Sequence, residues 1–206
     1  MISIFNAFAT EEKDLLGGTT RPLLVSVNTR NGYDKYVVKI FDNDGQFQHC
    51  PLANELYANQ IASQFDIKVP EPALISFSDS FIKTLDPDVK KRVSKNNSQL
   101  YFGCKYYDGF SQYIPAKHRR TFDSGSIEMI FALDVLIRNV DRRIGKSNLL
   151  VNKGDYLAID HELSLSTINK GFKDFGFDEW EFIHRLGSQR IHIFRPRLHR
   201  IGKAID

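Results

Sequence analysis

The stretch at residues 136–165, which reads LIRNVDRRIGKSNLLVNKGDYLAIDHELSL, holds the features that decide the fold. Two apolar runs, at residues 149–151 and 156–159, lie on either side of a turn signal, Gly154-Asp155. Short apolar runs around a glycine-containing turn predict a β-hairpin, here with a polar residue at each open end. An ordinary hairpin whose polar ends face solvent is the alternative interpretation.

The polar residues at the two open ends are Asn148 and Asp160, and Asp141 precedes both of them. Strand pairing would bring Asn148 and Asp160 together, and oxygen ligands at one end of a rigid hairpin suit Mg²⁺. Asp141 could orient or deprotonate an acceptor hydroxyl. These three side chains are what a phosphoryl-transfer site needs, with Asp141 as the catalytic residue and the other two as metal ligands.

The composition is that of a globular protein with a real core. The chain has 206 residues, 42% of them hydrophobic and 26% charged, which suits one domain or two small lobes. The net charge of +3 is too small to predict direct binding to nucleic acid. Positive charge is concentrated at residues 117–120 and 190–203. These basic stretches could be a solvent-facing surface or a site that binds a polyanion.

Cysteine usage and hydropathy indicate the compartment. Cys50 and Cys104 lack the spacing of a metal or redox motif, and so few cysteines fit a reducing environment. The N-terminal stretch MISIFNAFATEEKDLL has no basic region followed by a long apolar run, so it does not resemble a signal peptide. No segment approaches the ~18 apolar residues that span a bilayer. We therefore expect a cytoplasmic protein without membrane insertion.

The rest of the chain alternates predicted strands and helices. The predicted elements are strands at 23–28, 33–41, 73–77 and 100–107 and helices at 52–65 and 126–138. An Asn31-Gly32 turn joins the first two strands. Residues 126–138 are apolar nearly all round, which predicts a buried central helix, and the polar residues 86–99 predict an exposed loop. Residues 2–8 could form a strand or a short helix, and Thr10 looks like a helix start.

Three further features lie before the hairpin. Lys39 stands within the apolar strand YVVKIF, where a lysine either reaches solvent at an edge or points into a site. Glu55, on a predicted helix, is either a surface carboxylate or the partner that keeps a buried lysine charged. The stretch Gly17-Gly18-Thr19-Thr20 is either a helix end with a turn or a loop whose N–H groups approach a phosphate.

With these residues in place, the chain resembles the HipA-like kinases, compact HipA-type domains related to phosphatidylinositol 3/4-kinases. The resemblance runs from about residue 15 to residue 166. In chain order its motifs are GGTTRP, YVVKIF, ANELYANQIA, VPEPALI, YFGCKYY, NVDRRIGKSNLLV and YLAIDHELS, of which the last two are specific. The resemblance implies one kinase-like domain, 1–206, with an α+β, two-lobed, protein-kinase-like fold. Its β-rich N-lobe would be 1–103 and its reduced, mainly helical C-lobe 104–206.

The resemblance also implies roles for single residues. Lys39 would bind the α- and β-phosphates with Glu55 as its helix partner. Asp141 would be the catalytic aspartate, and Asn148 and Asp160 would be the metal ligands. The phosphate loop would consist of Gly17, Gly18, Thr19 and Thr20, and the hinge that contacts adenine would consist of Cys104, Lys105 and Tyr106. Because the family's phosphate loop can itself be phosphorylated, we expect slow, inactivating self-phosphorylation of that loop at one of its threonines.

These observations and the resemblance predict an ATP- and Mg²⁺-dependent phosphotransferase. Among such enzymes, a serine/threonine protein kinase is our first interpretation. A protein substrate is implied, and an antitoxin or regulatory partner, as in toxin–antitoxin systems, stays open. One alternative is a nucleotide-binding pseudokinase that acts as a regulatory module. The retained Asp141, Asn148 and Asp160 argue against it. The other alternative is a lipid or small-molecule kinase, which the DRxxGxxN pattern of residues 141–148 keeps open.

Overall fold

The computed structural model describes residues 2–11, 15, 21–41, 50–96, 99–114, 117–118, 124–139, 141–142 and 146–165. The chain divides into two compact units. The first comprises the described parts of Met1–Gln48 and Pro70–Asp108, and the second those of His49–Val69 and Gly109–Asp206. The predicted lobe boundaries, 1–103 and 104–206, stay a prediction, and the described residues 50–69 belong to the second unit.

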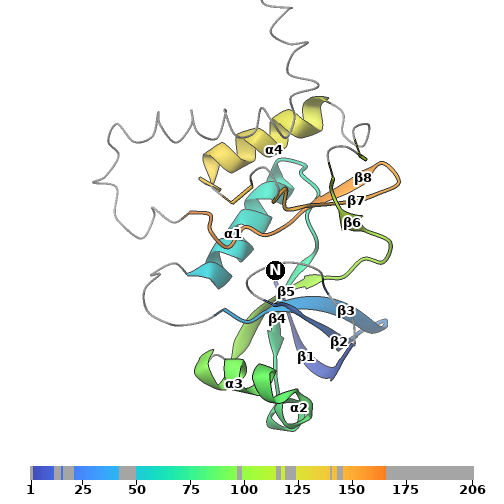
Figure 1. The fold of residues 1–206 in the computed structure, drawn as a ribbon, viewed down its shortest axis with the longest axis vertical. Coiled ribbons are helices and arrows are strands. Elements are labelled where there is room, and N and C mark those ends of the chain that lie inside the picture. The colour runs from blue at the N-terminus through green and yellow to red at the C-terminus, as the bar shows by residue number, and fades with distance from the viewer. Residues whose placement is uncertain are drawn as a thin grey trace, which may run out of the picture. The chain divides into compact units, whose positions relative to one another are not determined.

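Five strands of the first unit close into a barrel (Figure 1). They are β1 (Ser3–Thr10), β2 (Leu23–Thr29), β3 (Gly32–Lys39), β4 (Pro72–Ser76) and β5 (Leu100–Lys105). Their order is β1-β2-β3-β5-β4, and the parallel pairing of β1 with β4 closes the ring. All the other neighbouring pairs are antiparallel.

The β2–β3 hairpin confirms the prediction from Asn31-Gly32. Gly32 adopts a φ of +118°, a value that favours glycine, and it pairs with Thr29 where the hairpin closes. The first segment is a strand through Thr10, so the strand alternative for residues 2–8 is confirmed, and the helix expected after Thr10 falls mainly outside the described residues. The N–H of Glu11 donates to the carbonyl of Leu24 over 2.9 Å, which extends strand-like pairing past the end of β1.

Alternate residues of the strands fill the barrel interior. The buried core contains Ala7, Val25, Val27, Tyr36, Val38, Ile40, Ala73, Ile75 and Tyr101. The ring of Tyr36 lies 5.5 Å from that of Phe5, centre to centre. On β5 a glycine, Gly103, is required by close packing, because a Cβ there would lie 2.6 Å from Cγ1 of Ile75.

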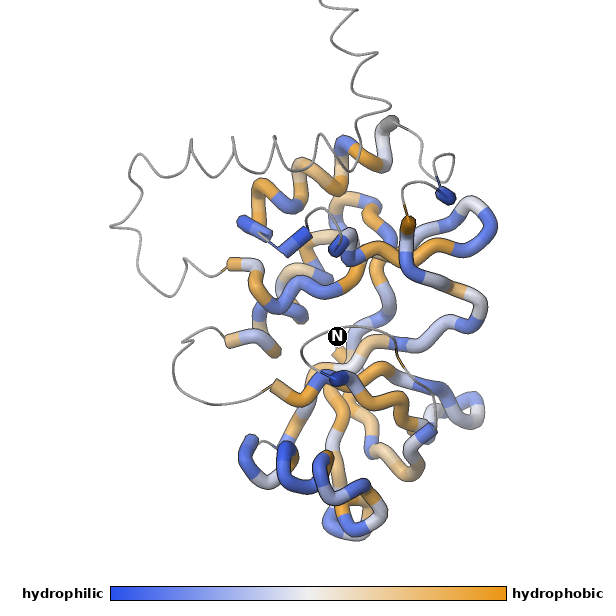
Figure 2. Tube along the Cα trace, in the orientation of Figure 1, coloured by the Kyte–Doolittle hydropathy of each residue, from blue (hydrophilic) through white to orange (hydrophobic). Residues whose placement is uncertain are grey.

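Two short helices follow β4, and both are largely hydrophilic in Figure 2. They are α2 (Asp79–Thr84) and α3 (Pro87–Asn96). The exposed loop predicted for residues 86–99 is therefore wrong over most of its length, because α3 buries Val93 and Asn96. The Asn96 amide donates to the carbonyl of Phe41, and Arg92 donates to that of Ile40. In this way α3 holds the chain just beyond β3.

The second unit combines two longer helices with a three-stranded antiparallel sheet. Its elements are α1 (Pro51–Gln64), α4 (Ser124–Leu136), β6 (Ser111–Gln112), β7 (Leu149–Asn152) and β8 (Asp155–Ala158). Its core joins Ala58 and Ala62 of α1 to Ile130 and Leu133 of α4 and to the sheet. α4 is not buried all round as predicted, because Leu136 is 58% exposed.

The β7–β8 hairpin has the predicted strands, but its turn lies one residue earlier. Lys153 and Gly154 form the turn with φ values of +43° and +92°, and Asn152 pairs with Asp155. Among the described residues, strands and four helices together confirm mixed α and β content. No helix in that part of the chain is long and apolar enough to cross a membrane.

Candidate active site

Asp141, Asn148 and Asp160 converge at the open end of the β7–β8 hairpin, within the second unit. The Asn148 amide nitrogen donates to Oδ2 of Asp141 over 3.2 Å and lies 3.5 Å from the carbonyl oxygen of Asp160. Asp141 and Asn148 are buried, and Asp160 is half-buried. The structure thus brings these three predicted side chains to one place, while their chemical roles stay predictions.

Lys146 is the cation of this group. Its ammonium contacts Oδ2 of Asp141 and lies 3.3 Å from Oδ2 of Asp160. Burial by itself would lower the Lys146 pKa, but the hydrogen bond to Asp141 and the charges of both aspartates outweigh it and raise that pKa. Lys146 therefore stays charged at neutral pH and links the two carboxylates.

Both ends of the hairpin have an unusual backbone conformation. Asn148 has a φ of +49° and Asp160 a φ of +65°. Asparagine and aspartate tolerate this left-handed region better than most side chains do, which suits these residue types at these positions. Such conformations persist only where the surroundings hold them in place.

Arg142 supplies part of that support. It is fully buried, and its Nε donates to Asp134 of α4 over 2.8 Å. Its guanidinium also donates to the carbonyl oxygens of Ser147 and Asn148, just before β7. Nη2 lies 3.3 Å from Nε2 of the buried His161, just after Asp160. One side chain thus joins α4 to the segments on both sides of the hairpin.

The end of α4 positions the segment that begins at Asp141. Arg138 has a φ of +52°, and the N–H of Asn139 donates to the carbonyl of Asp134 over 2.8 Å, as in a Schellman ending. The Asn139 side chain donates to Asp134 Oδ1 over 2.9 Å and accepts from the N–H of Asp141 over 3.1 Å. The helix end and the buried polar group therefore fix the backbone at Asp141.

Asp160 also belongs to a cluster of three carboxylates. The ligand oxygens of Glu55, Asp160 and Glu162 lie within 4.8 Å of one another. Glu55 belongs to α1, and Asn54 of the same helix donates to the carbonyl of Glu162 over 3.0 Å. Hard oxygen donors of this kind fit Mg²⁺, so the donor set is compatible with the predicted metal. Exposed acidic groups often cluster without an ion, but Glu55 is only 1% exposed.

The other predicted nucleotide-site residues belong to the first unit or lie outside the described residues. Lys39 ends β3 and is buried, and it pairs with Phe102 of β5. Lys39 and Glu55 belong to different units, so their contact stays a prediction. Of the predicted hinge, Cys104 and Lys105 end β5 and Tyr106 follows it, with its N–H donating to the carbonyl of Lys35. The predicted phosphate loop, Gly17, Gly18, Thr19 and Thr20, lies outside the described residues, as does its expected phosphorylation.

Sequence reasoning missed three residues of the site. Lys146 lies five positions after Asp141, between the predicted helix and the predicted hairpin, so no periodicity pointed to it. Arg142 was part of a recognised motif, but its complete burial could not be read from a charged residue type. Glu162 lies two positions after Asp160, just past the end of β8, and a second carboxylate at that spacing was the available signal.

Comparisons with known proteins identify the family and a similar fold. The fold is similar to that of a kinase of known crystal structure, CtkA, a Helicobacter pylori proinflammatory kinase, with a TM-score of 0.50 and 15% sequence identity. The similarity covers 80% of this chain and 60% of that chain. The profile of the HipA-like kinases matches residues 13–178, so the chain belongs to the HipA-like kinase family. The curated proteins contain no match.

Proposed function

We propose that this chain is an ATP- and Mg²⁺-dependent phosphotransferase that acts on a serine or threonine hydroxyl of a protein. The observation that carries the proposal is the convergence of Asp141, Asn148 and Asp160 around the Lys146 ammonium. Membership of the HipA-like kinase family supports the reaction class. The free cysteines Cys50 and Cys104 fit a reducing compartment such as the cytoplasm.

The chain's own residues would act mainly by position and charge. Asp141 would accept a hydrogen bond from the acceptor hydroxyl and take its proton as the hydroxyl oxygen attacks the γ-phosphorus. The bond from that phosphorus to the bridging oxygen of ATP breaks, and ADP leaves with the bonding electrons. Lys146 would stabilise negative charge that develops on the transferred group, because its ammonium lies between Asp141 and Asp160.

Other residues would hold the metal and the nucleotide. Asp160 and Asn148 would hold Mg²⁺, with Glu55 and Glu162 as further carboxylates within reach. When bound, the metal supplies charge neutralisation at the phosphates. Lys39 and the loop Gly17-Gly18-Thr19-Thr20 would contact the phosphates from the first unit, in a two-lobed arrangement. We also propose that the protein binds an antitoxin or another regulatory partner.

Transfer of label from γ-labelled ATP tests the proposal directly. Wild-type protein with Mg²⁺ and cell extract should label a protein band, and acid hydrolysis should release phosphoserine or phosphothreonine. Asp141→Ala should abolish labelling yet keep the thermal shift that ATP and Mg²⁺ produce, whereas Asp160→Ala should lose both. Asp88→Ala, an exposed carboxylate on α3, is the matched control and should behave like the wild type.

The outcomes separate the competing functions. A thermal shift without transfer to any acceptor would favour a nucleotide-binding pseudokinase. Label that appears in lipid or in a small molecule rather than in protein would favour the other kinase class. No shift at millimolar nucleotide would exclude all three, because a ligand at 100 times its dissociation constant adds about 2.7 kcal/mol of stability.

A further inference from the structure

A concave site lies at the tip of the β7–β8 hairpin, in the second unit. This cavity of about 390 Å³ is lined by Ser111 of β6, Lys117, His118, Asn152 and the turn residues Lys153 and Gly154. Asn152 lies four residues along β7 from Asn148, or about 13 Å at the rise of a strand. The cavity is therefore separate from the group around Asp141 and is not explained by phosphoryl transfer. We name this cavity the tip pocket.

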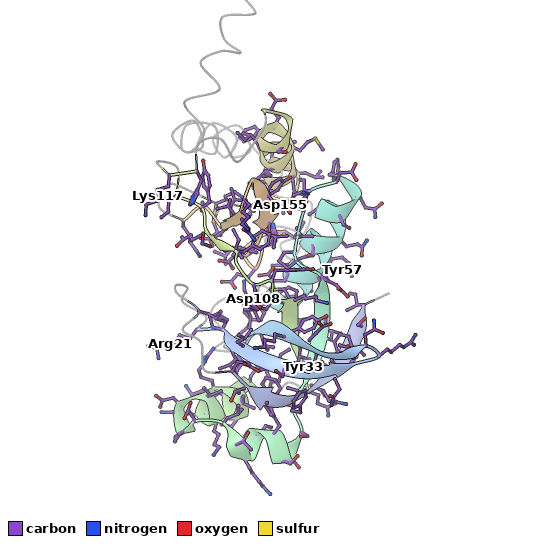
Figure 3. All side chains as sticks on the ribbon, turned by 90° about the vertical axis from the view of Figure 1, so that its right-hand side faces the viewer. Arg21, Tyr33, Tyr57, Asp108, Lys117 and Asp155 are labelled. Carbon is purple, nitrogen blue, oxygen red and sulfur yellow. The ribbon has the colours of Figure 1, made fainter. Side chains whose placement is uncertain are left out.

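The tip pocket is cationic. Lys117 and Lys153 are both exposed, and neither has an ion-pair partner among the described residues. Figure 3 shows Lys117 at the periphery of the second unit. None of the described residues that line the pocket is acidic, and the carboxylate of the adjacent Asp155 pairs with Lys68, whose Nζ lies 2.6 Å away. Two lysines that have no ion-pair partner among the described residues thus line one small concavity.

The wall of the tip pocket is held in place by local hydrogen bonds. The Nδ1 atom of His118 accepts from the N–H of Ile114 over 2.9 Å, and the N–H of His118 donates back to the carbonyl of Ile114. With Nδ1 accepting, a neutral His118 carries its hydrogen on Nε2, which is then a donor. The His118 ring also lies 5.9 Å from that of the buried Tyr113. The polar groups of the wall therefore favour an acceptor-rich ligand.

Gly109 and Asn152, which also line the pocket, pack closely against each other. A Cβ at Gly109, which has a φ of +81°, would lie 3.1 Å from the Asn152 amide nitrogen, so the Asn152 side chain packs directly on the glycine backbone. The hairpin turn at Lys153 and Gly154 closes this side. The pocket is thus built from two regions far apart in sequence, the stretch that includes β6 and residues 117–118, and the hairpin tip at residues 151–154.

We propose that the tip pocket is a docking site for an acidic, aspartate- or glutamate-rich segment of the protein that accepts the phosphoryl group. Carboxylates complement two lysines and a histidine donor, and none of the described residues that line the pocket is an arginine, the side chain whose planar fork favours bidentate contacts with phosphate. The separation of about 13 Å requires the acidic segment to lie at least about four residues from the acceptor hydroxyl in an extended chain. The docking role rests on the proposed function, but binding of an acidic peptide does not.

Fluorescence anisotropy of the full chain with a fluorescein-labelled peptide of glutamate and glycine tests the binding. The pocket variant is Lys117→Glu/Lys153→Glu, and the matched control is Lys83→Glu/Lys91→Glu, two exposed lysines of the first unit. Each pair of substitutions lowers the net charge from +3 to −1, since each reversal removes two charges. We expect binding about tenfold weaker in the pocket variant than in the control, and weaker at higher salt.

Several results would overturn the proposal. They are equal weakening in both variants, equal binding of a glutamine and glycine peptide, and tighter lysine-dependent binding of a single-stranded oligonucleotide than of the acidic peptide. The labelling assay with γ-labelled ATP separates this proposal from the function. Lysine-dependent peptide binding without any transfer would overturn the kinase activity and the docking role but keep the anion site. Transfer that is unaffected in KM and in kcat by the pocket variant would overturn the docking role alone.

Discussion

Arg142 and Asp134 form an ion pair of 2.8 Å in which both side chains are completely buried. Asp134 belongs to α4, and Arg142 follows Asp141, so the pair connects a helix of the core to the proposed catalytic segment. Taking two charges out of water is costly, and only further hydrogen bonds make it tolerable. Here Asn139 satisfies the second oxygen of Asp134, and two backbone carbonyls accept from Arg142.

Asp134→Ala should destabilise the protein by about 3–5 kcal/mol, because it leaves the Arg142 charge buried without its partner. Urea unfolding measures the loss. The matched control is Asp155→Ala, which removes the exposed pair with Lys68 and should cost less than about 1 kcal/mol. Equal losses in the two variants would show that the buried pair does not hold this part of the second unit together.

Lys146→Met should lower turnover by about a hundredfold if the ammonium stabilises the transferred group, while nucleotide affinity changes much less. Steady-state kinetics with a labelled acceptor, beside isothermal titration with ATP and Mg²⁺, separates the two effects. Lys146→Arg keeps the charge and should recover part of the rate. If Lys146→Met turned over like the wild type, the lysine would merely neutralise Asp141 and Asp160 in the free protein.

The hairpin at the centre of the site could be predicted because its information is local. Two apolar runs and a glycine fix β7 and β8, and their pairing necessarily brings Asn148 near Asp160. The burial of Arg142 could not be predicted, because it depends on contacts with Asp134, Ser147 and His161 that only the folded chain brings together. Local charge alone suggests a solvated residue there.

The helix α3 was missed for a different reason. Its composition is polar, and polar stretches between strands usually form loops. Pro87 at its first turn and Val89 and Val93, four residues apart, were a helical pattern short enough to overlook. The position of Glu55 shows another limit. The helix α1 was predicted correctly, but no local pattern shows that α1 packs within the second unit rather than the first.

Gly103→Ala should destabilise the barrel by about 1–3 kcal/mol, because its Cβ would lie 2.6 Å from Cγ1 of the fully buried Ile75. Ile75→Ala alone should cost about 2–5 kcal/mol through the cavity that it leaves. The double variant should be more stable than the sum of the two losses predicts, since removing Cγ1 makes room for the new methyl group. Chemical denaturation of the wild type, the two single variants and the double variant completes this double-mutant cycle. Strictly additive losses of stability would refute the clash.

Tyr36→Phe should change how stability depends on alkaline pH. Burial, assisted by the charges of Glu71 and Asp34, raises the Tyr36 pKa well above its ordinary value of 10.0. The unfolded chain therefore loses this proton first, so the stability due to a neutral Tyr36 is present below pH 10 and declines as pH rises beyond it.

Urea midpoints at pH 8 and pH 11 measure this effect. The wild type should lose stability relative to Tyr36→Phe between the two values, by an amount that grows with pH. Tyr33→Phe, at a tyrosine that is 65% exposed, serves as the control and should follow the wild type. A constant difference between wild type and Tyr36→Phe from pH 8 to pH 11 would show that the phenol ionises equally in both states.

The parallel pairing of β1 with β4 has a consequence for how this chain can be shortened or fused. β1 lies between β2 and β4, so every strand of the barrel has two hydrogen-bonded neighbours. Deleting residues 3–10 would expose the free edges of two strands at once, and unpaired edges invite pairing with other chains. A chain trimmed at its N-terminus should therefore aggregate even if the residues around Asp141 keep their arrangement.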